Sequence, residues 1–151
     1  MVDVSGKPSS TRTAIARGVI AVSPDTRRRI EAGENRKGDV IAISIIAGIT
    51  AAKQTSSLIP LCHALPIESV AVTFVWAQTD VEVKPSDDRK YLQCEAVVRT
   101  SAKTGVEMEA LTAVSIALLT VYDMCKANDH AMVIQGVELV EKTGGTKPWS
   151  R

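Results

Sequence analysis

Two segments in the middle of the chain alternate between apolar and polar residues, and this alternation constrains the fold more than any other feature. The apolar positions are every second residue of the two runs: Val70, Val72, Phe74 and Trp76 in the first, and Leu92, Cys94, Ala96 and Val98 in the second. Successive side chains of a strand point to opposite faces, so each run predicts a strand with one buried face. We expect the two strands to pair antiparallel, with residues 85–88 in the loop that connects them.

Helical patterns are found on both sides of this strand pair. Ser23 followed by proline, with Gly33 further on, predicts a short helix over 25–32. Residues 38–54 suit a strand by their isoleucines and a buried helix by their length and alanine content, and we predict a helix. Apolar residues recur with helical period over 106–126, which predicts the longest helix.

Segments 13–22 and 132–140 are rich in β-branched and other apolar residues and are predicted to be the first and last strands. The resulting order of strand, helices, strand, strand, helix and strand is the split-βαβ arrangement. It predicts an α+β, ferredoxin-like fold, an antiparallel sheet with helices packed on one face. A chain of 151 residues typically forms one domain. We expect that domain over 11–145, after a flexible segment over 1–10 and before a C-terminal tail over 146–151.

Composition excludes several classes of protein. The net charge is +1 and only 3% of residues are aromatic, which argues against a nucleic-acid partner. Cys62, Cys94 and Cys125 have no metal-ligand spacing, which indicates a reducing cytosol and no structural metal. No apolar run approaches about 18 residues and no targeting pattern is present at the N-terminus. We therefore expect a cytoplasmic protein with no metal and no membrane partner.

One of the two histidines lies in an otherwise apolar run, LIPLCH at 58–63, between Pro60 and Pro66. His63 could be a core or turn histidine whose ring nitrogens bond to the backbone. It could equally be a hydrogen-bond donor in the wall of a pocket. The run alone does not decide between these two interpretations.

Carboxylates lie near both ends of the helix predicted over 106–126. Glu109 and Asp123 fall on one face, about 21 Å apart at the rise of an α-helix. That distance is too long for one small reaction centre on one chain. Either the two carboxylates have unrelated roles, or two copies of the helix lie antiparallel across a dimer. Asp123 and Lys126 could also be an ordinary i,i+3 surface ion pair.

Three lysines precede a glycine by one or two residues at the predicted boundary of an element: Lys37, Lys103 and Lys142. Exposed backbone N–H groups and an ammonium can bind an anion together at such a boundary. The order of a Walker A loop is absent. As a set, the three motifs suggest a polyphosphate ligand.

Three blocks of sequence together resemble one enzyme family. They are KGDV at 37–40 with IAG at 46–48, LIPLCH at 58–63, and KTGVEMEAL at 103–111 followed by YDMCK at 122–126. In combination these blocks resemble the cyclic pyranopterin monophosphate synthases of molybdenum-cofactor (molybdopterin) biosynthesis, and the resemblance covers nearly the whole chain. Ala64 departs from the family pattern, in which proline usually follows the histidine.

The resemblance implies a lyase with a single catalytic domain and no cofactor. Such enzymes convert a cyclised dihydro-GTP to cyclic pyranopterin monophosphate with loss of pyrophosphate. The resemblance also implies a homo-oligomer, a hexamer built as a trimer of dimers, with each pocket between two subunits. Two other hypotheses remain open: a non-catalytic ferredoxin-like module that senses a nucleotide, and an oligomeric scaffold.

The resemblance also assigns roles to individual residues. The catalytic residues would be Asp123, as general acid/base, with Lys126 and Lys37. The substrate-binding residues would be Leu61, Cys62, His63, Glu107, Met108, Glu109 and Lys142. We expect Cys62 to present its backbone rather than a nucleophilic thiol. No role is assigned to the hairpin at 85–90 or to residues 147–151.

Overall fold

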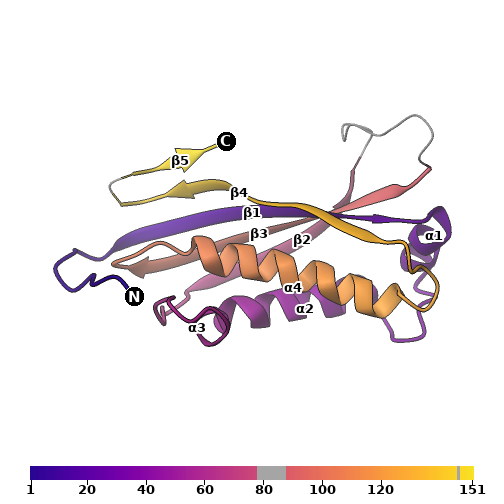
Figure 1. The fold of residues 1–151 in the computed structure, drawn as a ribbon, viewed down its shortest axis with the longest axis horizontal. Coiled ribbons are helices and arrows are strands. Elements are labelled where there is room, and N and C mark those ends of the chain that lie inside the picture. Colours follow the sequence, from indigo (N-terminus) through magenta and orange to yellow (C-terminus); the bar gives the residue numbers. More distant parts are fainter. Residues whose placement is uncertain (78–87, 146) are drawn as a thin grey trace.

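A five-stranded antiparallel sheet carries helices on one face (Figure 1). The computed structural model of the protein describes residues 1–77, 88–145 and 147–151. The elements are, in order, β1 (Ser10–Val22), α1 (Pro24–Ala32), α2 (Val40–Lys53), α3 (Thr55–Leu58), β2 (Ser69–Trp76), β3 (Lys90–Ala102), α4 (Glu107–Cys125), β4 (Val133–Thr143) and β5 (Trp149–Ser150). The strand order β2-β3-β1-β4-β5 confirms the predicted α+β, ferredoxin-like fold.

Most predicted elements are present with shifted ends. The ambiguous run at 38–54 is helix α2, as predicted. β1 and β3 extend beyond the predicted strands, and they pair along their whole length from Ser10↔Ala102 to Val22↔Lys90. The prediction missed the short helix α3 and the strand β5, which pairs with β4. The predicted loop at 85–88 lies outside the described residues, except for its last residue.

The core lies between the sheet and α4, which runs beside α2 on the same face (Figure 1). The alternating residues of β3 that were predicted to be buried are at most 1% exposed: Leu92, Cys94, Ala96 and Val98. They face the apolar stripe of α4, in which Val114, Leu118 and Val121 are fully buried. α4 is long and apolar enough to cross a membrane by length and composition. Because its inner side forms this core, it is accounted for as the central helix of the domain.

Glycines allow α4 to approach its neighbours closely. A Cβ at Gly18 of β1 would lie 2.8 Å from side-chain atoms of both Val114 and Leu118. On the other side, a Cβ at Gly48 of α2 would lie 3.0 Å from the carbonyl oxygen of Ala113 and 3.2 Å from Cβ of Ala117. Backbone atoms cannot move aside as a flexible side-chain end can. The distance between α2 and α4 therefore depends on the absence of a side chain at Gly48.

We predict that Gly48→Val lowers the free energy of unfolding by about 1–3 kcal/mol, because the added side chain forces α2 away from α4. Urea unfolding followed by circular dichroism measures the change. Ala42→Val is the matched control, since Ala42 is exposed on the same helix and receives the same branched side chain without the contact. Equal stability of the two variants would contradict the close approach of the helices.

Candidate active site

The candidate site residues fall into two groups at opposite ends of α4. Glu107, Met108 and Glu109 lie in its first turn and Asp123 lies in its last turn. The rise of the helix separates Glu109 from Asp123 by about 21 Å. Within one chain, the structure does not bring the residues predicted to be catalytic to the residues predicted to bind substrate.

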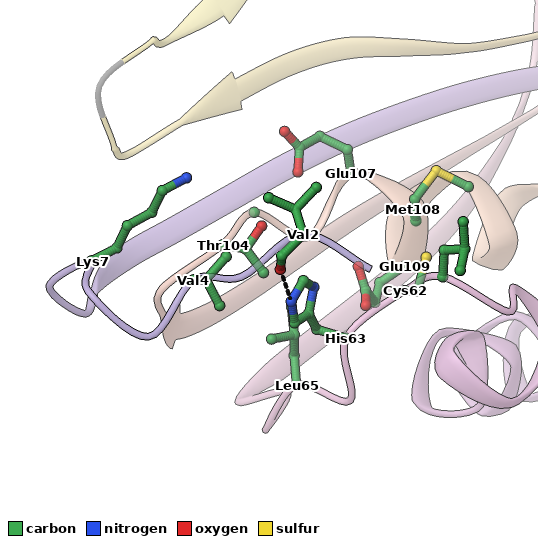
Figure 2. A pocket seen from close by; sticks show the side chains of 12 residues that line it. Val2, Val4, Lys7, Cys62, His63, Leu65, Thr104, Glu107, Met108 and Glu109 are labelled. Carbon is green, nitrogen blue, oxygen red and sulfur yellow. Dashed lines mark hydrogen bonds between the residues drawn. The ribbon is translucent and has the colours of Figure 1, made fainter.

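Six of the seven residues predicted to bind substrate line one cavity at the start of α4, with a volume of about 460 Å³. They are Leu61, Cys62, His63, Glu107, Met108 and Glu109. The segment that follows α3 supplies three of them and the first turn of α4 supplies the other three (Figure 2). We call this space the first cavity.

The N-terminal segment passes over the first cavity. Val2, Val4 and Lys7 line it, and the carbonyl oxygen of Val2 lies 2.9 Å from Nε2 of His63 (Figure 2). His63 is partly exposed and contacts this segment rather than the core. Sequence reasoning treated residues 1–10 as a flexible segment and missed this contact, which no local pattern signals.

Glu109 is a buried carboxyl group in this otherwise partly open cavity. Only 4% of the residue is exposed. Burial raises its pKa, a hydrogen bond from its own backbone N–H lowers it, and the nearby charge of Glu107 raises it further. Burial and the charge of Glu109 also raise the pKa of the Cys62 thiol. A thiol that stays protonated is a poor nucleophile, in keeping with a structural role for Cys62.

A second, basic cavity of about 570 Å³ adjoins the first. The two cavities share Lys7, Thr104, Gly105 and Glu107. Five cationic side chains line the basic cavity: Lys7, Arg12, Lys103, Lys142 and Lys147. Two of the three lysine–glycine motifs therefore meet here, whereas Lys37 lies elsewhere. Sequence reasoning missed Lys7, Arg12 and Lys147 as candidates for the site.

Strand pairing explains why these cations gather. β1 pairs with β3 on one side and with β4 on the other, so that Ser10 lies opposite Ala102 and Thr13 lies opposite Thr143. The start of β1 thus meets the ends of both neighbours. The pairing register is the signal that would have pointed to Arg12.

Two glycines bring the end of β4 against the start of β1. Gly144 and Gly145 have φ angles of 82° and 74°, in the left-handed region that favours glycine. A Cβ at Gly144 would overlap the carbonyl oxygen of Thr11, and a Cβ at Gly145 would overlap the guanidinium of Arg12. This close turn places the end of β4, which includes Lys142, beside Arg12.

Internal oxygen atoms already bind several of the cations in the basic cavity. Nζ of Lys142 lies 3.0 Å from Oε1 of Glu107. Lys103 donates to the carbonyl oxygen of Ser5 over 2.6 Å. The cavity therefore holds strong hydrogen-bond donors whose present partners are a carboxylate and a backbone carbonyl.

At the far end of α4, Asp123 lies between two ammonium groups. Its carboxylate oxygens are 2.6 Å from Nζ of Lys37 and 2.7 Å from Nζ of Lys126. Hydrogen bonds from Lys126 and Lys37 lower the pKa of Asp123 to about 2. The expected i,i+3 pair of Asp123 and Lys126 is confirmed, and Lys37 is a further partner.

Asn35 holds Lys37 in this position. Its side-chain amide donates to the carbonyl oxygen of Met124 over 3.0 Å, and its Oδ1 accepts the backbone N–H of Lys37 over 2.9 Å. Two residues beyond Lys37, Asp39 caps α2 by accepting from the backbone N–H of Ala42. The loop before α2 is thus tied to the end of α4. Sequence reasoning did not single out Asn35.

Comparison with known proteins identifies the family. Residues 1–145 match the sequence model described as the MoaC family, and the chain belongs to that family. It is 52% identical over 149 residues to the cyclic pyranopterin monophosphate synthase of Rhodopirellula baltica, a match that covers 96% of this chain and 83% of that protein. It is 50% identical over 145 residues to the protein of the same name from Desulfitobacterium hafniense, a match that covers 96% of this chain and 83% of that protein. It is 47% identical over 152 residues to the protein of the same name from Thermomicrobium roseum, a match that covers 100% of this chain and 86% of that protein.

We predict that the carboxylate of Asp123 stays ionised down to about pH 2 because two ammonium groups stabilise its charge. Replacing Lys37 or Lys126 with alanine should raise this pKa toward the ordinary value for aspartate. Carbon-13 NMR of the side-chain carboxyl group over a pH titration measures it. An unchanged pKa in both variants would contradict the paired geometry.

We predict that the stability of Glu109→Gln relative to that of the wild type increases as the pH rises from the ordinary pKa of glutamate through the raised pKa of the folded protein. The pKa of Glu109 is raised in the folded protein, so the native state binds this proton more tightly than the unfolded chain does. Its contribution to stability is present at low pH and is lost as the pH rises through the folded pKa. Urea unfolding of both proteins at several pH values measures the difference. A difference that does not vary with pH would contradict the desolvation of this carboxyl group.

Proposed function

We propose that the protein is a lyase that converts 3′,8-cyclo-7,8-dihydroguanosine triphosphate to cyclic pyranopterin monophosphate and pyrophosphate in molybdenum-cofactor biosynthesis. Membership of the MoaC family and relatives about 50% identical that carry the name of this activity support the proposal. The structural observation that carries it is the junction of two cavities, one with a buried carboxyl group and one with five cations.

The two cavities suit the two ends of such a substrate. The purine-derived end would lie in the first cavity, where Glu109 and the backbone beside Met108 offer hydrogen bonds. The triphosphate would lie in the basic cavity, where Lys142 and Lys103 can meet charge that develops as pyrophosphate leaves. Because the cavities share Gly105 and Glu107, one extended ligand can span both.

The cluster at the far end of α4 requires a second copy of the chain in this proposal. Asp123, Lys37 and Lys126 are about 21 Å along the helix from the first cavity. Two α4 helices lying antiparallel across a dimer would bring the cluster of one subunit to the cavity of the other. Exposed apolar side chains on α2 and α4 favour such contact: Ile46 is 64% exposed and Leu119 is 51% exposed. The hexamer, as a trimer of such dimers, follows from the resemblance.

The low pKa of Asp123 affects how the proton chemistry is divided. An aspartate with a pKa of about 2 is ionised at neutral pH and cannot donate a proton there. A carboxylate with so low a pKa is also a weak base, so we assign to Asp123 the task of holding the two ammonium groups in place. Lys37 and Lys126 are then the proton donors to the ring being opened and closed.

We also propose the extent of the catalytic domain, the cellular location and the cofactor requirement. The catalytic domain would cover 11–145, and the reaction would take place in the cytoplasm. No cofactor is required. The main competing hypothesis is a module that binds the nucleotide without altering it, and release of pyrophosphate separates the two.

We predict that Asp123→Ala and Lys126→Ala each lower the rate of pyrophosphate release from the cyclised nucleotide by at least about 100-fold, because the proton donors and their anchor are lost. A coupled pyrophosphate assay measures the rate. Lys53→Ala is the control, since Lys53 is an exposed lysine at the end of α2. Saturable binding by the wild type without pyrophosphate release would favour the sensing module instead.

Mixing defective subunits tests the shared site. In a dimer of one His63→Ala chain and one Asp123→Ala chain, one site would carry both defects and the other would carry none. If each variant alone has lost activity, co-refolding the two should therefore restore part of it. No recovery in verified mixed oligomers would contradict a site built from two chains.

A further inference from the structure

Glu107 occupies an unusual position for a carboxylate. Among the described residues that line the basic cavity, it is the one acidic side chain, and five cations line the same cavity. It also lines the first cavity, so it lies at the junction between them. A group in this position acts on any anion that extends from one cavity into the other.

The Glu107 carboxylate occupies the space that a side chain at Gly105 would fill. A Cβ at Gly105 would overlap the Glu107 carboxylate and would lie 2.7 Å from its Cδ. Gly105 has no positive φ angle, so its backbone would accept alanine. An alanine at this position would therefore displace the Glu107 carboxylate, which is the flexible end of its side chain.

From this position Glu107 pairs with one of the five cations of the basic cavity, Lys142. Its Oε1 lies 3.0 Å from Nζ of Lys142, and the two side chains are 28% and 35% exposed. A phosphate that binds Lys142 must compete with this carboxylate and is also repelled by it. Lys103 differs, because its partner is the uncharged carbonyl oxygen of Ser5. A bound phosphate thus competes with another negative charge at Lys142, where Glu107 is the partner, and not at Lys103.

We propose that Glu107 weakens the hold of the basic cavity on pyrophosphate and so favours its release. This role differs from direct contact with the substrate, which the resemblance implied for Glu107. The inference rests on the proposed function only for the identity of the anion. Its physical content is that the carboxylate and a phosphate compete for Lys142.

Binding of inorganic pyrophosphate tests this role without any turnover. Isothermal titration calorimetry on Glu107→Gln should show an affinity about fivefold higher than that of the wild type, the size expected for a partly exposed charge pair. Glutamine keeps the shape and removes the charge. Gly105→Ala should shift the affinity in the same direction by a smaller factor, because it moves the carboxylate off Lys142 and leaves the charge in place. Glu31→Gln is the matched control, since Glu31 forms an exposed ion pair with Arg27 far along the chain from this site.

The outcomes separate this inference from the proposed function. Unchanged or weaker pyrophosphate binding in Glu107→Gln, or no measurable binding by either protein, overturns the role of Glu107. If the wild type also releases pyrophosphate from the cyclised nucleotide, the proposed function still stands. Conversely, tighter binding in Glu107→Gln and in Gly105→Ala supports the role even if the wild type does not act on that nucleotide. In the turnover assay, the role further requires a lower inhibition constant for pyrophosphate in Glu107→Gln than in Glu31→Gln.

Discussion

The close packing of α4 against the sheet and against α2 is the constraint on which the rest of the structure depends. Gly18 on one side and Gly48 on the other let the helix approach to distances that any side chain would prevent. A helix held on two sides has little freedom to slide or turn. Its first turn is therefore fixed beside His63, and its last turn is fixed beside Lys37.

Such a helix also keeps its two ends apart, which shapes the chemistry available to one chain. The end with Glu109 has a desolvated carboxyl group whose pKa is raised. The end with Asp123 has an exposed carboxylate whose pKa is lowered by two ammonium groups. Carboxyl groups with opposite pKa shifts suit opposite tasks, one favouring the protonated form and one the ionised form. In the proposed function, bringing them to one ligand requires a second copy of the chain.

The fold could be predicted because it rests on periodic patterns. Alternation in β2 and β3 and the apolar stripe of α4 are local signals, and together they leave few topologies. The basic cavity could not be predicted in the same way. Arg12 and Lys142 meet because of the register between β1 and β4, and register depends on pairing across the whole sheet. The burial of Glu109 could not be predicted from local sequence either, because glutamate is rarely buried in protein interiors. His63 was singled out by its place in an apolar run and Lys37 by the glycine that follows it, and the family resemblance then gave them roles. Asn35, which positions Lys37, carries no pattern of its own.

The N-terminal segment over the first cavity has a thermodynamic consequence. The carbonyl oxygens of Val2 and Ser5 already accept hydrogen bonds at His63 and Lys103. A ligand that uses these two donors exchanges one set of hydrogen bonds for another instead of adding new ones. The enthalpy of association then reflects only the difference between the two sets, while the freed segment regains conformational entropy. Association of a ligand that spans both cavities is therefore expected to be less exothermic than a count of its contacts would suggest.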